Sequence, residues 1–252
     1  MFQARYDSIG QNYSTTRRED QFILNRINFA LGEAKTVVNV GAGAGSYEPS
    51  NRIVLAVEPS KAMALQRRTD SLPSIRATAD NLPLHDKSVD AAMTVLSLHH
   101  WEPHQKTGIQ EMCRVAREKV VIVTIDPRVS GNMWLMADYL PEVAALDHQV
   151  FPLPEVICEW LDCATQVETL PIHRDTLDWN LLSFWAHPER VLDPSARAAT
   201  SGFARQSEDI VQRVVSGVQS DLARGVWDER YGTLRSLQEL DVGLRLITGT
   251  LT

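Results

Sequence analysis

Three glycines at alternate positions and one later carboxylate form the clearest chemical pattern in the chain. The glycines are Gly41, Gly43 and Gly45, and the carboxylate is Glu58. Alternate glycines remove the Cβ atoms from one side of a turn, so the backbone can bend tightly and approach a ligand closely. Glu58 follows Gly41 by 17 residues, close to the roughly 20 at which a carboxylate accepts the ribose hydroxyls of a nucleotide. The spacing therefore predicts a nucleotide-binding site.

A second pattern is the histidine pair His99-His100, which Trp101 follows. The histidine side chain titrates near neutral pH, and this property suits a general base. Paired histidines also hydrogen-bond to the backbone or line a ligand pocket. Both roles stay open for this pair.

Apolar runs place these groups at the ends of predicted strands. Residues 37–40 and 53–57 are such runs, and they lead into the glycines and into Glu58. Residues 88–101 predict a fourth strand that ends at the histidines, and a helix at 105–117 leads to a fifth strand at 119–126. In an open α/β sheet the ligand crevice lies outside the carboxyl ends of the strands, so these groups are expected to meet there.

The detailed spacing distinguishes between nucleotides. A dinucleotide fingerprint, Gly-x-Gly-x-x-Gly, places a helix N-terminus on a pyrophosphate, but Ser46 stands where its third glycine would fall. Taken with Glu58 and the later Leu82-Pro83 pair, the loop resembles that of the class I S-adenosylmethionine-dependent methyltransferases, of the small-molecule, type 11-like group. The resemblance is firm over about residues 36–127 and loose elsewhere.

The resemblance implies a set of cofactor-binding residues: Tyr13, Arg17, Asn39, Gly41, Ala42, Gly43, Gly45, Glu58, Pro59, Met63, Thr78, Ala79, Asp80 and Leu98. Asn39 stands where the family usually has an acid, and its amide can still orient the loop through hydrogen bonds. Thr78 replaces the acid that reads the adenine edge, so either Thr78 with the Ala79 backbone makes this contact or Asp80 has taken it over.

Tyr13 and Arg17 are predicted to share one face of a leading helix. The family comparison implies that this helix folds over the bound cofactor, with Arg17 reaching the methionyl carboxylate and Tyr13 covering it. The alternative is a solvated arginine beside a packing tyrosine.

The acceptor is expected to lie near Trp101 and the segments after residue 126. Residues 128–162 are rich in Trp, Leu and Met and resemble helices that cover the acceptor side, and a long helical stretch at 181–237 is a second candidate. The predicted acceptor contacts are Trp101, Trp134, Tyr139 and Trp185, with Trp179, Phe184 and Phe203 as further candidates in the insert. Ordinary core packing is the competing interpretation for every one of these aromatic residues.

The expected fold is α/β: a Rossmann-like, doubly wound, mostly parallel seven-stranded sheet with helices on both faces. We expect one domain over residues 1–252, with an N-terminal helical lid at 1–30, a cofactor-binding core at 36–127 and acceptor-side helical elements at 128–162 and 177–237. The sixth strand is predicted at 167–172, and the last strand, after the insert, at 242–247.

Composition restricts the partners. The chain has 252 residues, 44% of them apolar, and a formal net charge of −7, which disfavours nucleic acid as a partner because nucleic-acid binders present a basic face. The pair Arg67-Arg68 is interpreted as a solvated helix surface. No apolar run reaches the ~18 residues of a membrane span, and the N-terminus lacks the apolar core of a signal peptide. A cytoplasmic protein without membrane contact is expected.

Three cysteines, Cys113, Cys158 and Cys163, are too few and too irregularly spaced for a disulfide framework or a CxxC metal site. They are interpreted as core thiols, with capture of a soft metalloid as the alternative, and no metal site is expected. The sequence leaves the oligomeric state open.

The function implied by the resemblance is transfer of a methyl group from S-adenosylmethionine to a small-molecule acceptor by in-line displacement. The sulfonium is already activated, so the protein supplies mainly orientation and desolvation, with a base where the acceptor holds a proton. Two alternatives remain: an NAD(P)-dependent oxidoreductase of Rossmann type, and a non-catalytic S-adenosylmethionine-binding regulatory protein.

Overall fold

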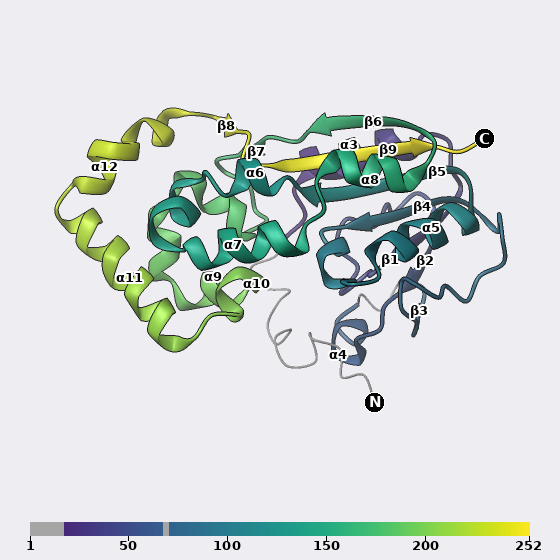
Figure 1. Cartoon of the computed structure of the whole chain (residues 1–252), viewed down its shortest axis with the longest axis horizontal. Coiled ribbons are helices and arrows are strands. Elements are labelled where there is room, and N and C mark those ends of the chain that lie inside the picture. Colours follow the sequence, from purple (N-terminus) through teal and green to yellow (C-terminus); the bar gives the residue numbers. More distant parts are fainter. Residues whose placement is uncertain (1–17, 68–70) are drawn as a thin grey trace.

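The computed structural model describes residues 18–67 and 71–252 (Figure 1). At its centre is a seven-stranded sheet with the strand order β3-β2-β1-β4-β5-β9-β6. The parallel strands are β1 (Thr36–Val40), β2 (Ile53–Val57), β3 (Ser74–Ile75), β4 (Val89–Val95) and β5 (Ala116–Ile125). The strand β9 (Leu244–Thr250) runs antiparallel between β5 and β6 (Ala164–Thr169). The predicted mostly parallel, seven-stranded sheet is confirmed.

Helices cover both faces of the central strands, and the side chains of each strand alternate between these two faces. On β5, Val121 and Val123 pack into a core that includes helix α3 (Gln21–Leu31). Val120 and Ile122 point the other way, into a core that includes helices α5 (Gln105–Val115) and α8 (Pro154–Leu161). This arrangement confirms the prediction of helices on both faces.

The strand order reverses between β1 and β4. The chain moves outward from β1 through β2 to β3 and then returns to pair β4 with the other side of β1, so that Val38 lies opposite Ala92. Such a reversal opens a crevice at the carboxyl ends of the two strands. The glycine loop leaves β1 at this crevice, and the 3-10 turn η1 (Leu98–His100) follows β4 there.

A second helical layer lies beyond the end of the sheet (Figure 1). Its first part, after β5, comprises α6 (Pro127–Ser130), the π-helical turn η2 (Leu135–Tyr139) and α7 (Pro141–Val150). Its second part comprises η3 (Leu181–Ala186), η4 (Pro188–Leu192), α9 (Pro194–Ala198), α10 (Ser201–Ala204), α11 (Glu208–Ala223), α12 (Val226–Tyr231) and η5 (Gly232–Ser236).

The helical stretch predicted at 181–237 is therefore a series of separate helices, which include the 16-residue α11. Pro188 and Pro194 each occupy the first turn of a new helix, because proline fits that position and breaks a preceding helix. A two-stranded sheet, β7 (Ile172–His173) with β8 (Glu239–Leu240), joins the two ends of the insert. The sequence did not predict this small sheet.

Several strand boundaries differ from the prediction. The fifth strand begins at Ala116, and the sixth ends at Thr169, before Pro171, which cannot donate to a ladder. The last strand begins at Leu244, after Gly243, whose φ of 97° takes the chain into the strand through a turn.

Within the described residues, no helix has the length and apolar character needed to cross a membrane. The predicted lid lies largely in residues 1–17, outside the described part of the chain.

Candidate active site

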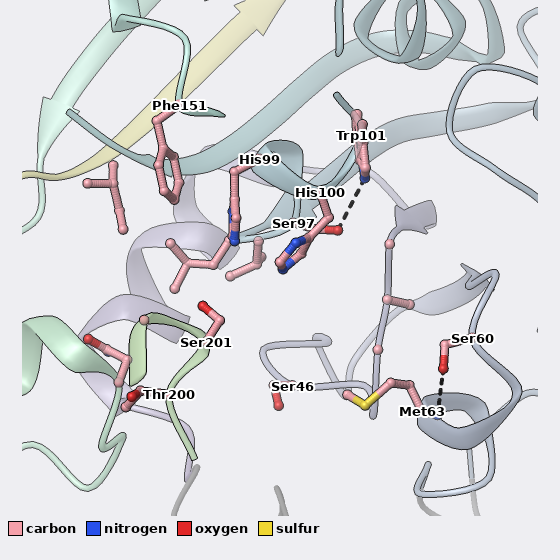
Figure 2. A pocket seen from close by; sticks show the side chains of 18 of the residues that line it. Ser46, Ser60, Met63, Ser97, His99, His100, Trp101, Phe151, Thr200 and Ser201 are labelled. Carbon is pink, nitrogen blue, oxygen red and sulfur yellow. Dashed lines mark hydrogen bonds between the residues drawn. The ribbon is translucent and has the colours of Figure 1, made fainter. Parts of the chain in front are cut away.

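One cavity of about 430 Å³ opens at the reversal of strand order (Figure 2). One half is lined by residues of the glycine loop and the neighbouring strand ends: Asn39, Gly41, Ala42, Gly43, Ala44, Ser46, Glu58, Pro59, Ser60, Met63 and Thr78. The other half is lined by residues of η1 and of the second helical layer: His99, His100, Val143, Leu146, Asp147, Phe151, Leu181, Leu182, Thr200, Ser201, Gly202 and Arg205. The sequence-predicted loop and the histidine pair thus meet in one space.

Gly41 must be a glycine in this loop. Its φ is 70°, and a Cβ at this position would lie 1.9 Å from Ser97 Oγ. The amides of Gly41 and Ala42 both donate to the carbonyl of Val57, at 2.9 and 3.0 Å, which fastens the loop to the end of β2. Ser97 Oγ in turn accepts a hydrogen bond from Trp101 Nε1 at 3.2 Å. The turn after β4 therefore packs directly against the glycine loop.

Glu58 connects the loop to the next helix. It is 7% exposed, and its two oxygens accept hydrogen bonds from the amides of Gly43 (2.7 Å) and Ser60 (2.8 Å). Ser60 also caps α4 (Lys61–Ala64) by accepting from the Met63 amide at 3.2 Å. The cap holds Met63, 4% exposed, beside the glycine loop (Figure 2). A carboxylate held at the cavity wall by backbone amides is fixed in place to accept further donors.

A buried polar chain supports the end of β1. Asn39 Nδ2 donates to Glu48 Oε1 at 3.0 Å, and Glu48 forms a two-point ion pair with Arg67 at 2.9 and 2.7 Å. The Arg67 side chain is only 5% exposed, so the interpretation of this arginine as a solvated surface residue is wrong. No residue in the described ranges donates to the buried Oδ1 of Asn39.

At the predicted adenine edge, Thr78 is the residue that reaches the cavity. Ala79 is buried in the core with α5, and Asp80 lies outside the cavity with its carboxylate 3.9 Å from His104 Nδ1. The sequence left Thr78 with the Ala79 backbone and Asp80 as alternatives. The geometry favours Thr78.

The other half of the cavity combines aromatic rings with charged groups. The His99 ring stacks on Phe151 with centroids 4.3 Å apart and lies 3.7 Å from the His100 ring. Arg205 Nη2 lies 3.1 Å from His100 Nδ1. Burial raises the pKa of Asp147 to about 7, against the opposing effect of the Arg205 charge. This half can bind, orient and exchange protons with a ligand.

Tyr47 joins three distant segments at the cavity edge. Its hydroxyl donates to Asp178 at 2.8 Å and accepts from the Asp20 amide at 3.1 Å. Asp20 accepts from Thr176 at 2.5 Å, and Asn180 lies within 3.4 Å of Asp178. The end of the glycine loop is therefore bonded to the segment before α3 and to the start of the insert.

Several predicted site residues lie outside the cavity lining. Gly45 belongs to the loop but faces Arg67, and Leu98 is buried in the core with α5. Trp134, Tyr139 and Trp185 are core residues, together with Phe184 and Phe203. Trp179 packs against the Arg190 guanidinium at 4.7 Å.

The tryptophans and the tyrosine are held there by polar bonds as well as packing. Trp134 Nε1 donates to the Trp185 carbonyl at 2.9 Å, Trp185 Nε1 donates to the Ile172 carbonyl at 3.1 Å, and the Tyr139 hydroxyl donates to Asp221 at 2.7 Å. Buried rings whose polar atoms are hydrogen-bonded in this way form the core beneath the second helical layer. Trp101 does line the cavity, but its indole braces Ser97 and the glycine loop.

Tyr13 and Arg17 lie outside the described residues. The three cysteines lie away from the cavity, and burial raises the pKa of the Cys113 thiol to about 11. The sequence reasoning did not identify Ser97, Asp147, Phe151 and Arg205. Ser97 stands two residues before the histidines and could have been noticed, whereas the other three come from helices whose approach to the crevice has no local sequence signal.

Comparisons with known proteins agree with this geometry. A family model described as a methyltransferase domain matches residues 38–124. Comparison with curated protein sequences gives no match.

Among solved structures, a candidate methyltransferase from an antibiotic biosynthesis pathway of Anabaena variabilis is 32% identical, with a TM-score of 0.87 over 94% of this chain and 99% of that chain. A methyltransferase of Thermotoga maritima that depends on S-adenosylmethionine is 17% identical, with a TM-score of 0.53 over 92% of this chain and 89% of that chain. Phosphoethanolamine N-methyltransferase 2 of Haemonchus contortus, solved with phosphomonomethylethanolamine and S-adenosylhomocysteine, is 14% identical, with a TM-score of 0.56 over 98% of this chain and 56% of that chain.

The last two matches are matches of fold, whereas the Anabaena protein is a relative over nearly the whole length of both chains. Its similarity and the matched domain favour S-adenosylmethionine as the cofactor over the nicotinamide of an NAD(P)-dependent oxidoreductase. The chain belongs to the class I S-adenosylmethionine-dependent methyltransferases: it is an enzyme, and its cofactor is S-adenosylmethionine.

Proposed function

We propose that the enzyme methylates a small molecule, which binds in the half of the cavity lined by η1, α7, η3 and α10. The observation that carries this proposal is the continuity of the cavity from the glycine loop to these elements. A cofactor at the loop and an acceptor among the helices then share one cavity. We call the two parts of the cavity the cofactor half and the acceptor half.

Size and charge support a small acceptor. A cavity of about 430 Å³ lies within the range of small-ligand sites. The net charge of −7 opposes a polyanion. The Anabaena relative is assigned to an antibiotic biosynthesis pathway, which is a setting of small-molecule chemistry.

The residues of the cofactor half fit S-adenosylmethionine. Glu58, fixed by two backbone amides, would accept the ribose hydroxyls. The Oδ1 of Asn39, buried and without a donor among the described residues, would accept from the ammonium of the methionyl part. Met63 and Thr78 would lie against the adenine. Gly41 and Gly43 keep this side of the cavity free of Cβ atoms.

When bound, the cofactor supplies a methyl group on a positively charged sulfur, which needs no further activation. The protein's contribution is therefore to orient the acceptor and to keep water out. Val143, Leu146, Phe151 and Leu181 give the acceptor half apolar walls. His99 and His100 present polar ring atoms in the same half (Figure 2) and would contact the acceptor there.

Methyl transfer from isotopically labelled S-adenosylmethionine tests the proposal. The purified enzyme is incubated with the small-molecule fraction of a cell extract, and the products are separated by mass. We expect label in a molecule below ~1 kDa, and we expect the Glu58→Ala variant to transfer far less. Label confined to protein or nucleic acid would overturn the small-molecule acceptor. Binding of S-adenosylhomocysteine without any transfer would favour a regulatory role instead.

A further inference from the structure

The titratable groups of the acceptor half have different hydrogen-bonding partners. The guanidinium of Arg205 can only donate, and it lies 3.1 Å from His100 Nδ1. His100 Nδ1 therefore accepts through its lone pair, and the neutral ring carries its proton on Nε2. In this state the Nδ1 lone pair of His100 is engaged by Arg205 and cannot take a proton from an acceptor.

His99 is held between two rings. Its centroid lies 4.3 Å from that of Phe151, with an interplanar angle of 27°, and 3.7 Å from that of His100. The side chain is 7% exposed. This packing fixes His99 as part of the cavity wall.

Asp147 is the carboxylate of this half. It lies on α7 one turn after Val143 and one turn before Phe151, and all three residues line the cavity. Asp147 is half-buried, and among the described residues no group donates a hydrogen bond to its carboxylate. Burial raises its pKa to about 7. A carboxylate in an apolar wall, poised near neutrality, has the properties of a general base.

The charged surroundings of Asp147 are limited. Arg205, which follows α10, is the charge that acts on it. The other titratable or charged groups of the cavity and of the elements packed against α7 are His99, His100 and Glu102 of the cavity wall, Glu142 and His148 of α7 itself, Arg128 of α6, and Asp138 of η2. Glu142 forms an ion pair with Arg213, and Asp138 forms one with Arg230. Arg128 pairs with both Asp126 and Glu155.

Resting on the proposed function, we infer that Asp147 is the catalytic base, which takes the proton of an acceptor hydroxyl or amine as the methyl group is transferred. A lone pair of the acceptor oxygen or nitrogen forms the bond to the methyl carbon. The bond from that carbon to sulfur breaks, and its electrons stay on sulfur. The O–H or N–H bond of the acceptor breaks, and its proton passes to a carboxylate oxygen of Asp147. His99 and His100, which line the same half of the cavity, position the acceptor.

The inference predicts a pH profile. Below pH ~7 the carboxyl group of Asp147 is increasingly protonated and cannot accept a second proton, so the rate should fall as the pH is lowered. An acceptor that binds as a preformed anion would not show this dependence. The inference therefore applies to acceptors whose hydroxyl or amine keeps its proton at neutral pH.

The experiment compares the wild type with Asp147→Asn, Asp147→Glu and the control Glu142→Gln. Glu142 lies on the same helix, outside the cavity lining, in a surface ion pair. The readouts are labelled methyl transfer to the small-molecule fraction of a cell extract between pH 5.5 and 8.5, and affinity for S-adenosylhomocysteine by calorimetry. A third readout, which needs no turnover, is the pH titration of the Asp147 carboxyl carbon by ¹³C NMR.

We expect Asp147→Asn to lower transfer by about 10²-fold or more with nearly unchanged affinity for S-adenosylhomocysteine. Asp147→Glu should recover part of the rate, Glu142→Gln should match the wild type, and the Asp147 signal should titrate near pH 7. Transfer by Asp147→Asn within a factor of ~3 of the wild type, or titration of Asp147 near pH 4, would overturn the inference. A wild type that transfers no label would instead overturn the proposed function, and the two failures are therefore distinct.

Discussion

Substitution of Gly41 by alanine tests whether the glycine loop is shaped by its contact with the turn after β4. At Gly41 the backbone has a φ of 70°, and an added Cβ would lie 1.9 Å from Ser97 Oγ. Gly225 provides a matched control, because its φ is 74° and nothing lies within 4 Å of an added Cβ. Both alanines carry the same backbone strain, and only the first meets a neighbour.

The expected loss of stability has two parts, the backbone strain at positive φ and the contact between the added Cβ and Ser97. An alanine in the left-handed region costs roughly 1–2 kcal/mol at either site. Forcing a Cβ into a packed space adds roughly 1–3 kcal/mol at Gly41 alone. At ~2–4 °C per kcal/mol for a chain of this size, the Tm of Gly41→Ala should lie roughly 2–12 °C below that of Gly225→Ala.

The assay is thermal unfolding of both variants together with calorimetric titration of S-adenosylhomocysteine. Relief of the contact should also displace the loop, so we expect at least tenfold weaker binding for Gly41→Ala and unchanged binding for Gly225→Ala. Adding Ser97→Gly to Gly41→Ala should destabilise the protein by less than the sum of the two single changes. Equal Tm values for the two alanine variants, or an additive double variant, would refute the reasoning.

Three further changes have defined outcomes. Glu58→Gln removes the charge of a carboxylate that accepts hydrogen bonds from two backbone amides. Because charge-assisted hydrogen bonds contribute ~1.5–3 kcal/mol, calorimetry should show that the affinity for S-adenosylhomocysteine falls roughly 10–100-fold. Unchanged affinity would argue against a ribose contact. Tyr47→Phe deletes the hydroxyl that joins the loop to Asp178 and should lower the free energy of unfolding in urea by ~1–3 kcal/mol; a neutral effect would show that this junction adds no stability. Hydrogen bonds from Thr36 lower the pKa of Asp90 to about 2 from 3.8, so the stability that this carboxylate contributes is complete above pH ~4 and is lost as the pH falls toward 2. The difference in unfolding free energy between wild type and Asp90→Asn should shrink over that range, and a constant difference would contradict the assignment.

The cofactor half was predictable because its signals are local. Gly41 and Gly43 mark a turn that needs positive φ, and Glu58 ends the next apolar run, so each residue reports its own backbone environment. Parallel strands then bring their carboxyl ends to one edge whatever the side chains further along the chain. The meeting of His99 with the loop follows from the same rule.

The acceptor half was not predictable from the same kind of signal. Trp134 and Trp185 are of a residue type that often contacts ligands. Their indoles instead donate hydrogen bonds to carbonyls within the core, and they do not line the cavity. Asp147 and Arg205 have no local pattern, since they enter the cavity only through the packing of α7 and α10 against the sheet end. Arg67 likewise is of a residue type that usually lies at the surface. Its guanidinium is buried because it forms an ion pair with Glu48 in the interior.

A crystal structure of the enzyme with S-adenosylhomocysteine tests the central claim, that one cavity holds the cofactor at the glycine loop and the acceptor beyond it. The account predicts the ribose hydroxyls within hydrogen-bonding distance of the Glu58 carboxylate, the amino group near Asn39 Oδ1, and the sulfur facing the space between His99 and Asp147. A ligand bound elsewhere, or one whose sulfur faces away from that space, would contradict it.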